Sequence, residues 1–266
     1  MSDRVTCNIQ DGVADVRMNR PEKMNALDGA LFSALVETGE ALKTDPSVRA
    51  VVLSGEGRAF CAGLDFGSFQ AMAGDSETDL ENVTPPRGGE ITNPGQQAAF
   101  VWQEIPAPVI AAVHGVALGG GFQIALGADI RIVAPDVKMS VLEVRWGLIP
   151  DMTGTQLLPK VVGLDVAKEL TFTGRMIDGH EALRLGVATK VSETPLVDAL
   201  ALAHEIASKS PQAIRGAKAL LNMAGEVGLA DGFKAEERTI RSLIGSPNQV
   251  EAVKAYFEKR DPVFDD

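Results

Sequence analysis

Three consecutive glycines, Gly119–Gly121, stand directly before a short apolar run and are the first feature of this chain that suggests chemistry. A glycine-rich turn at the start of a helix points several backbone N–H groups in one direction, which suits a phosphate or a developing oxyanion. The phosphate-binding loop needs GxxxxGK[ST] and the dinucleotide loop needs GxGxxG with particular flanks, and this triplet fits neither pattern. It therefore favours oxyanion stabilisation, with close packing of a helix on a strand as the non-catalytic alternative.

A second glycine-containing turn, "GRAFCAGLD" (residues 57–65), follows a predicted strand and can supply another backbone N–H. Its Cys61 could act as a nucleophile, but no histidine in its sequence context would activate it. We interpret Cys61 as a small buried side chain. His114 is expected to be a hydrogen-bonded core histidine, and His180 and His204 fall at exposed helical positions. The three histidines show no metal-ligand spacing, so no metal site is expected.

Two carboxylates are candidates for proton transfer. Glu143 lies in the apolar stretch "SVLEVRWGLIP", and burial would raise its pKa towards values useful for a general base. Asp151 comes eight residues later, before a Thr-Gly-Thr turn that is predicted to start a helix, and it could instead be an N-cap. Two carboxylates that converge near two oxyanion donors suit proton abstraction next to a carbonyl. Gln123 follows the glycines, and its amide can orient a group but cannot exchange a proton near neutral pH.

The elements that must position these residues form an α/β pattern. Residues 5–18 alternate in polarity around an Asp-Gly pair, which predicts a β-hairpin, and Asp28 is predicted to cap a helix. Residues 73–97 are polar and rich in Pro and Gly, and we interpret them as a mobile surface loop that could act as a lid. The remaining predictions are a helix over 29–45, buried strand regions over 49–57 and 108–118, a helix over 121–129, two short strands within 130–141, and four helices from about Pro195 onwards.

The composition excludes several classes of partner. The chain has 266 residues, and its 25 basic and 36 acidic residues give 25 − 36 = −11. Such an acidic chain is a poor match for nucleic acid or an anionic membrane, which both need clustered positive charge. Its two cysteines form no CxxC pair, and no apolar run is long enough for a membrane span or a signal peptide. These features predict a soluble cytoplasmic protein without a disulfide framework.

Several long motifs together resemble the enoyl-CoA hydratase/isomerase (crotonase) superfamily, in order and spacing, from about residue 5 to 260. The resemblance implies a crotonase-like spiral of ββα units over residues 1–194 and a helical trimerisation region over 195–266. It also implies an acyl-CoA thioester as the ligand, no separate cofactor because the substrate carries the coenzyme A, and a homotrimer or a dimer of trimers. The motifs are "NRPEKMNAL", "GRAFCAGLD", "PVIAAVHGVALGGGFQIALGADIRI", "EVRWGLIPDMTGTQLLPKVVG" and "AKELTFTGRMIDGHEALRLGVATKV".

The resemblance also implies roles for individual residues. The oxyanion hole would be the backbone N–H groups of Leu64 and Gly120. Coenzyme A would lie near Ala62, with Lys23 and Arg58 as candidates for its phosphates, although both could equally be ordinary surface charges. A further basic residue in the last helix, Lys259, could reach a neighbouring subunit's ligand.

The acid pattern decides which reaction the resemblance favours. Hydratases of the superfamily have glutamates at the positions of Gln123 and Glu143, whereas dienoyl-CoA isomerases have acids at those two positions and at that of Asp151. This chain keeps Glu143 and Asp151, so we expect double-bond isomerisation through a dienolate, with Gln123 positioning the substrate. Enoyl-CoA hydration is the main alternative. Thioester hydrolysis or another enolate reaction, a non-catalytic acyl-CoA-binding protein and an RNA-binding member of the fold are further alternatives, the last disfavoured by the net charge.

Overall fold

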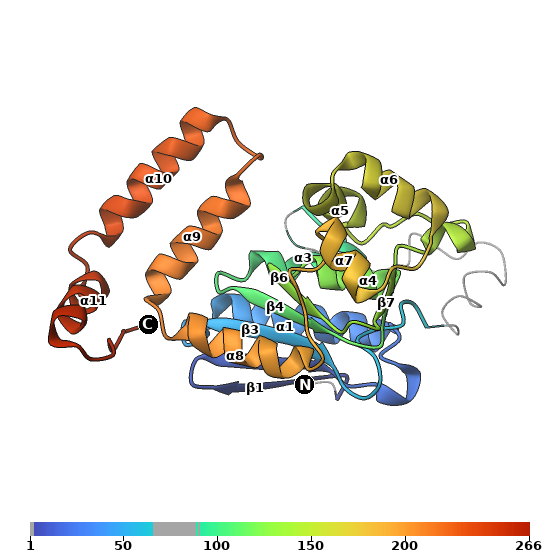
Figure 1. Ribbon diagram of the computed structural model, residues 1–266, viewed down its shortest axis with the longest axis horizontal. Coiled ribbons are helices and arrows are strands. Elements are labelled where there is room, and N and C mark those ends of the chain that lie inside the picture. The colour runs from blue at the N-terminus through green and yellow to red at the C-terminus, as the bar shows by residue number, and fades with distance from the viewer. Residues whose placement is uncertain (1–2, 66–88, 90) are drawn as a thin grey trace.

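A six-stranded sheet forms the centre of the molecule in the computed structural model, which describes residues 3–65, 89 and 91–266 (Figure 1). The strand order is β1-β2-β3-β4-β6-β8, and β1 and β2 form the only antiparallel pair among the described strands of this sheet. Asp11 and Gly12 join them with φ values of 52° and 78°, which confirms the predicted hairpin and its turn. The strands are β1 Val5–Gln10, β2 Val13–Met18, β3 Ala50–Gly55, β4 Val109–Val113, β6 Ile130–Val133 and β8 Lys190–Val191.

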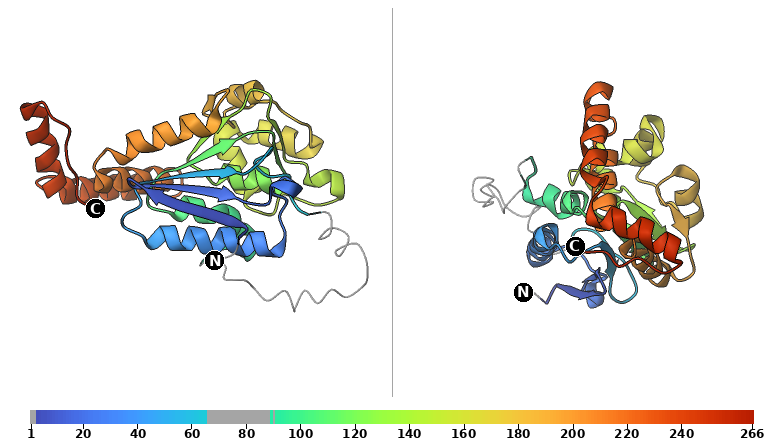
Figure 2. Two further views of the ribbon diagram at one scale, coloured as in Figure 1. Left: turned by 90° about the horizontal axis from the view of Figure 1, so that it is seen from below. Right: turned by 90° about the vertical axis from the view of Figure 1, so that its left-hand side faces the viewer.

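The sheet is buried on both faces because its strands carry apolar side chains on each side. In β3, Val51 and Leu53 pack towards α1 (Gly29–Thr44), α3 (Pro94–Glu104) and α4 (Gly120–Leu126), while Val52 belongs to the cluster on the opposite face under α8 (Pro195–Ala207). Figure 2 shows the sheet between α1 and α8. A strand that is covered on both faces reads as a continuous apolar run rather than an alternating one, as "AVVL" does here.

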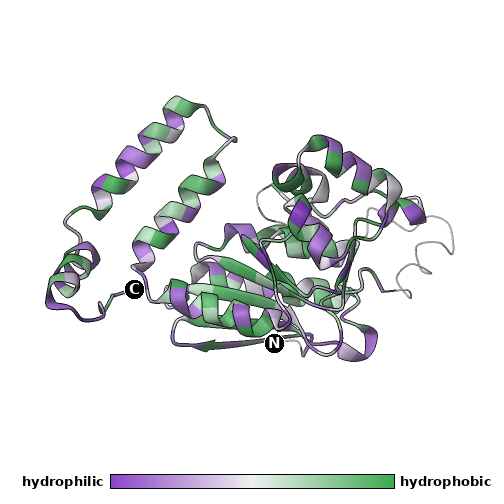
Figure 3. Ribbon diagram, viewed as in Figure 1, coloured by the Kyte–Doolittle hydropathy of each residue, from purple (hydrophilic) through white to green (hydrophobic). Residues whose placement is uncertain are grey.

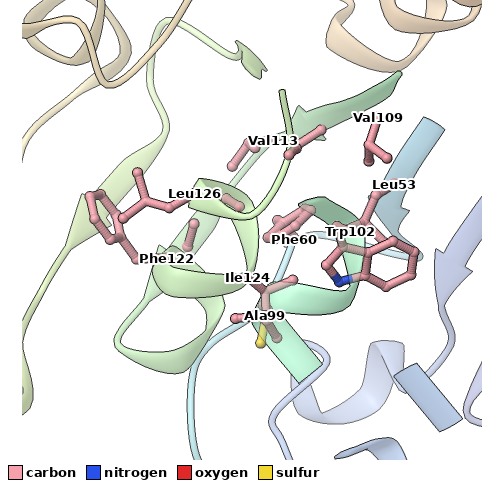
Figure 4. Close-up of a cluster of buried hydrophobic side chains, with 14 of the residues drawn as sticks. Leu53, Phe60, Ala99, Trp102, Val109, Val113, Phe122, Ile124 and Leu126 are labelled. Carbon is pink, nitrogen blue, oxygen red and sulfur yellow. The ribbon is translucent and has the colours of Figure 1, made fainter. Parts of the chain in front are cut away.

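The larger core lies between the sheet and the helices that carry the glycine turn. Figure 4 shows side chains of α4 packed with the indole of Trp102 from α3 and with Val109 and Val113 of β4. Asp28 accepts a hydrogen bond from Leu31 N at 2.8 Å and so caps α1 as predicted. This packing holds the start of α4 rigidly against the strands.

The apolar region over 108–118 forms two strands rather than the single strand region predicted. After β4 the chain turns at His114 and Gly115, and then enters β5 (Val116–Leu118), which pairs with β7 (Lys138–Ser140) in a separate sheet. Gly115 has φ 62°, and a Cβ there would lie 2.0 Å from the Arg58 carbonyl oxygen. The glycine therefore allows a sharp change of direction that the apolar composition does not reveal. His114 is half-buried, with a ring nitrogen 2.9 Å from the Gly57 carbonyl oxygen.

The predicted loop over 73–97 lies mostly outside the described residues, and its end is helical. Asn93 caps α3, and Asn93 and Gln96 exchange side-chain hydrogen bonds in a capping box, with Pro94 at the first helical position. The loop prediction was therefore wrong for residues 94–97. Asn-Pro followed by Gln at the third helical position is itself a helix-start signal.

The four predicted C-terminal helices are confirmed. Beyond α8 they are α9 (Pro211–Met223), α10 (Leu229–Leu243) and α11 (Pro247–Glu258), which stand apart from the sheet in Figure 1. Polar and apolar residues alternate along α10 in Figure 3. The chain end returns to the sheet, where Arg49 Nε donates to Asp266 at 2.6 Å. The boundary at residue 194 between the core and the helical region stays a prediction. Helix α8 begins just after it and packs on the sheet.

Three further helices are α5 (Gly154–Val162), α6 (Leu164–Thr173) and α7 (Gly179–Leu185). Two short 3-10 helices are η1 (Pro21–Lys23) and η2 (Glu143–Trp146). In the part of the chain that the structure describes, no helix has both the length and the apolar character that a bilayer span requires.

Candidate active site

The two glycine-containing turns meet beyond the carboxyl edge of the parallel strands. β3 runs into "GRAFCAGLD", and β4 runs through β5 into Gly119, while a parallel bridge joins Cys61 to Ala117. A Cβ at Gly63 would lie 2.7 Å from the Leu118 carbonyl oxygen and 4.0 Å from Gly120 N. The carboxyl ends of parallel strands are the usual place for a ligand in such sheets.

Each glycine of the triplet is required by its surroundings. Gly119 has φ 52°, a conformation that L side chains rarely adopt. A Cβ at Gly120 would lie 2.7 Å from Leu27 Cδ1 and 2.9 Å from Met152 Sδ, and a Cβ at Gly121 would lie 2.5 Å from the Cys61 carbonyl oxygen. The glycine triplet thus allows close packing, and this packing is compatible with a role of its N–H groups in oxyanion stabilisation.

Leu64 and Gly120 both line the cavity at this edge, and their N–H groups donate to no acceptor within the described residues. The neighbouring groups are paired, since Leu27 N donates to Gly63 O at 2.7 Å and Asp65 N donates to Leu27 O at 3.0 Å. Gly120 is the first residue of α4, where an N–H has no partner within the helix. Two backbone donors on neighbouring turns therefore line the cavity without an acceptor from the described residues, and their shared role as an oxyanion hole stays a prediction.

The cavity between these turns and the segment over 142–152 has a volume of about 420 Å³. One wall contains the polar residues Gln123 and Glu143, and the other walls are largely apolar. Besides the glycine turns, α1 contributes Phe32, α3 contributes Gly95, and the segment after β7 contributes Trp146 and Met152. A mostly apolar cavity with a few convergent polar groups is typical of a small-molecule site.

Glu143 is the first residue of η2 and is only 9% exposed. Burial raises the pKa of its carboxyl group, and the nearby charge of Asp151 raises it further. Its Oε1 would be 3.4 Å from a Cβ on Gly119, so the carboxylate lies beside the residue that precedes the Gly120 donor. Its Oε2 is buried and has no hydrogen-bond partner among the described residues. One oxygen of the carboxylate is therefore available to a ligand.

Gln123 is buried, and both ends of its amide are engaged. Its Nε2 donates to Glu143 Oε1 at 2.6 Å, and its Oε1 accepts from the backbone N–H groups of Met152 and Gly154, each at 2.9 Å. Because N–H groups can only donate, the amide oxygen must face them and the NH₂ group must face Glu143. The structure thus gives Gln123 a role towards Glu143, and its predicted contact with substrate stays a prediction.

Asp151 lines the same cavity but is exposed. It does not cap a helix, because α5 begins after Thr153, which has φ 75° and makes no side-chain cap. The N-cap alternative is therefore wrong, although the prediction that the Thr-Gly-Thr turn starts a helix is confirmed, since α5 begins at Gly154. Asp151 and Glu143, the two acids paired in the sequence analysis, therefore line the same cavity.

Comparison with known proteins places this geometry in a family. The family sequence model described as enoyl-CoA hydratase/isomerase matches residues 8–266. The chain belongs to the enoyl-CoA hydratase/isomerase family. It is similar to the mitochondrial enoyl-CoA hydratase domain-containing protein 2 of Homo sapiens, with 36% identity over 98% of this chain and 88% of that protein. It is also similar to the mitochondrial methylglutaconyl-CoA hydratase of Mus musculus, with 34% identity over 94% of this chain and 79% of that protein.

Solved structures confirm the crotonase fold that the resemblance implied. An enoyl-CoA hydratase from Bacillus anthracis superposes with a TM-score of 0.88 and 30% identity, over 98% of both chains. The protein is therefore an acyl-CoA enzyme of the enoyl-CoA hydratase/isomerase family.

Among the residues expected to bind coenzyme A, Lys23 and Arg58 are not part of the cavity lining. Ala62 lines the cavity and donates its N–H to Met24 O at 2.9 Å, next to Lys23. Lys23 and Arg58 are both exposed, so their phosphate contacts stay predictions of the family resemblance. Lys259 is the C-cap residue that follows α11, and its contact with a neighbouring subunit's ligand also stays a prediction.

Two backbone groups of this family member's site were missed in the sequence analysis. The backbone N–H groups that hold Gln123 come from Met152 and Gly154, and a Cβ at Gly154 would lie 2.7 Å from Gln123 Oε1. The glycine within the Thr-Gly-Thr turn was the available signal. Cys61, in contrast, is buried as expected, and burial raises the pKa of its thiol to about 12, which is unsuited to a nucleophile.

Proposed function

We propose that the enzyme shifts double bonds of an unsaturated acyl-CoA through a dienolate. The observation that carries this proposal is the engagement of the whole Gln123 amide by Glu143, Met152 and Gly154. Among the described residues that line the cavity, Glu143 is the only buried acid. Moving a proton along one acyl chain needs a single well-placed base, whereas a pair of buried carboxylates would suit the holding of a water molecule.

The reaction begins at the thioester carbonyl, which accepts hydrogen bonds from the N–H groups of Leu64 and Gly120. Each such donor typically contributes about 2.7–4 kcal/mol of transition-state stabilisation. The carboxylate of Glu143 then removes a proton from C2, and the electron pair delocalises over the thioester oxygen and the conjugated chain. The position of Glu143 beside Gly119 supports this assignment, because C2 is adjacent to the carbonyl that Gly120 holds.

The second proton transfer depends on the substrate. In a 3-enoyl chain Glu143 returns its proton to C4, and in a 3,5-dienoyl chain Asp151 relays a proton from solvent to C6. The first route restores Glu143 directly. In the second route Glu143 keeps the proton from C2 and Asp151, which is exposed to solvent, passes one to C6, so Glu143 must release its proton to solvent before the next turnover. The substrate and product have the same composition, and coenzyme A remains part of both.

Enoyl-CoA hydration is the second candidate. The relatives described above carry the name hydratase, and the free Oε2 of Glu143 could activate a water molecule. Such a hydratase would activate water with the carboxyl group of Glu143 beside the side-chain amide of Gln123.

Incubation with three substrates tests the proposal. A 3-enoyl-CoA, a 3,5-dienoyl-CoA and a 2-trans-enoyl-CoA are followed by ultraviolet absorbance and by mass. Isomerisation leaves the mass unchanged, whereas hydration adds one water. Rapid, Glu143-dependent hydration without isomerisation would contradict the proposal, and tight binding without any turnover would indicate an acyl-CoA-binding protein.

We also infer that the protein assembles as a homotrimer or a dimer of trimers through the helices after α8. Large apolar side chains on α10 and α11 support this, since Phe233 is 62% exposed and Phe257 is 78% exposed. Exposed apolar surface of this kind is typical of an interface. The molecular mass in solution, measured by light scattering, tests the assembly. The cytoplasmic location stays a prediction.

A further inference from the structure

The part of the cavity away from the glycine turns is apolar. Leu148 and Ile149 lie on the segment between η2 and α5, Phe32 comes from α1, and Leu142 and Trp146 flank Glu143. Among the described residues that line the cavity, none is a lysine, an arginine or a histidine, and the two charged ones are the acids Glu143 and Asp151.

The order of groups along the cavity indicates where the acyl tail lies. The thioester end is set by the donors at Leu64 and Gly120. Met152 comes next, because its Sδ would be 2.9 Å from a Cβ on Gly120 and its Cγ would be 3.9 Å from a Cβ on Gly95 of α3. Leu148, Ile149 and Asp151 line the same cavity and precede Met152 in one segment, so the inferred course of the tail runs along them.

A second carboxylate on the acyl group would be unfavourable in this position. It would lose part of its water against apolar side chains without gaining a positive partner, and a charge that loses water without a partner is unfavourable. It would also be repelled by two acids of the same sign at short range. A methyl-terminated chain meets neither penalty and gains from the burial of its apolar surface.

We propose that the site takes uncharged, apolar acyl groups and rejects acyl groups that end in a carboxylate. The proposal rests on the proposed function only in placing the thioester at Leu64 and Gly120. It names the substrate class by charge and does not depend on whether the chain is isomerised or hydrated.

Binding of two saturated thioesters tests the proposal directly. Hexanoyl-CoA and adipoyl-CoA have acyl chains of the same length, and they differ in ending with a methyl or a carboxylate group. Because neither has a double bond, isothermal titration calorimetry measures binding without turnover. We expect hexanoyl-CoA to bind at least about tenfold more tightly at pH 7.5, a difference of about 1.4 kcal/mol. Equal affinities would overturn the proposal, and so would undetectable binding of both compounds, because the acyl group would then lie elsewhere.

A gain of binding provides the complementary test. Ile149 is 68% exposed, so Ile149→Lys should fold normally and place a positive charge at the tail end of the cavity. We expect adipoyl-CoA to bind about tenfold more tightly to this variant and hexanoyl-CoA to bind less tightly. Leu148→Lys is the second variant, since Leu148 is 45% exposed and lines the same wall. Val197→Lys on α8, where Val197 is 63% exposed and lies outside the cavity lining, is the matched control.

The outcomes separate this proposal from the proposed function. No gain of adipoyl-CoA affinity in Ile149→Lys or Leu148→Lys would overturn the placing of the tail. An equal gain in Val197→Lys would show a general charge effect and would overturn it as well. If the preference for hexanoyl-CoA holds while the unsaturated substrates are hydrated, the substrate class stands and the isomerase assignment fails.

Discussion

Gln123 donates its side-chain amide to Oε1 of Glu143 at 2.6 Å, and the amide cannot turn over because two backbone N–H groups hold its oxygen. The acid is thereby oriented by a residue on α4, directly after the glycine turn. A neutral amide at this place keeps one oxygen of Glu143 occupied and the other free. This relationship is the source of the first prediction.

Replacing Gln123 by Met should lower kcat for isomerisation by about 10- to 100-fold with little change in KM, because Glu143 loses its orienting donor while the cavity keeps its shape. The hydrogen bond from Gln123 lowers the pKa of Glu143, so its loss should move the acidic limb of the kcat/KM profile to higher pH. Steady-state kinetics over pH 5–9 measures both effects.

Gln123→Glu is the informative companion to that variant. A carboxyl group can still accept from Met152 N and Gly154 N, but its second oxygen would face Glu143. The two acids would then share a proton, and the acidic limb should move to higher pH than in the wild type. An unchanged pH profile in both variants would refute the orienting role.

Glu143→Gln should reduce isomerisation by about 100- to 10,000-fold, since the base is lost while its shape is kept. The same change should raise the free energy of unfolding at pH 7 by about 1 kcal/mol, as is common when a destabilised active-site group is neutralised. Chemical denaturation measures the second effect, and acyl-CoA affinity serves as the control for an intact site.

The pH dependence of that stability gain has a definite sign. Burial raises the folded-state pKa of Glu143 above its unfolded value, so the folded protein binds this proton more tightly. The wild type therefore loses stability as the pH rises from the unfolded pKa through the raised one. The advantage of Glu143→Gln should be present at neutral pH and should vanish below the ordinary pKa of a glutamate. A constant advantage at every pH would contradict this account.

Asp151→Asn should abolish isomerisation of a 3,5-dienoyl-CoA while sparing that of a 3-enoyl-CoA, because only the longer transfer uses Asp151. The charge of Asp151 raises the pKa of Glu143, so the remaining activity should persist to lower pH than in the wild type. Because Asp151 is exposed, the free energy of unfolding should change by less than about 0.5 kcal/mol. Equal losses for both substrates would argue against a separate role for Asp151.

Gly154→Ala should lower activity, although Gly154 is not one of the two residues, Leu64 and Gly120, whose N–H groups are the candidate oxyanion donors. Its Cβ would lie 2.7 Å from Gln123 Oε1, so Gln123 must shift away from Gly154, which disturbs its hydrogen bond to Glu143. We expect a loss of about 1–3 kcal/mol in the free energy of unfolding together with reduced kcat. Gly232→Ala is the control, since a Cβ at this position of α10 meets nothing within 4 Å and should stabilise by about 0.5–1 kcal/mol. Wild-type kcat in Gly154→Ala would show that the Gln123 contact is dispensable.

The elements that the sequence predicted well depend on short-range signals. The hairpin follows from Asp11-Gly12 between alternating residues, and α1 begins where Asp28 can accept from Leu31 N. The helices after Pro195 follow from their apolar periodicity. The break between β4 and β5 could not be seen in this way, because it depends on the close approach of Gly115 to the Arg58 carbonyl, 57 residues earlier in the chain.

By itself, the sequence determined the family, the two glycine turns and the candidate acids, because these are local patterns of residue type in a recognisable order. Only the tertiary structure decided what Gln123 does. A side-chain amide carries both a donor and an acceptor, so its orientation depends on the partners that the fold supplies. Here those partners lie 20 to 31 residues further along the chain, at Glu143, Met152 and Gly154, and folding alone brings them to one point.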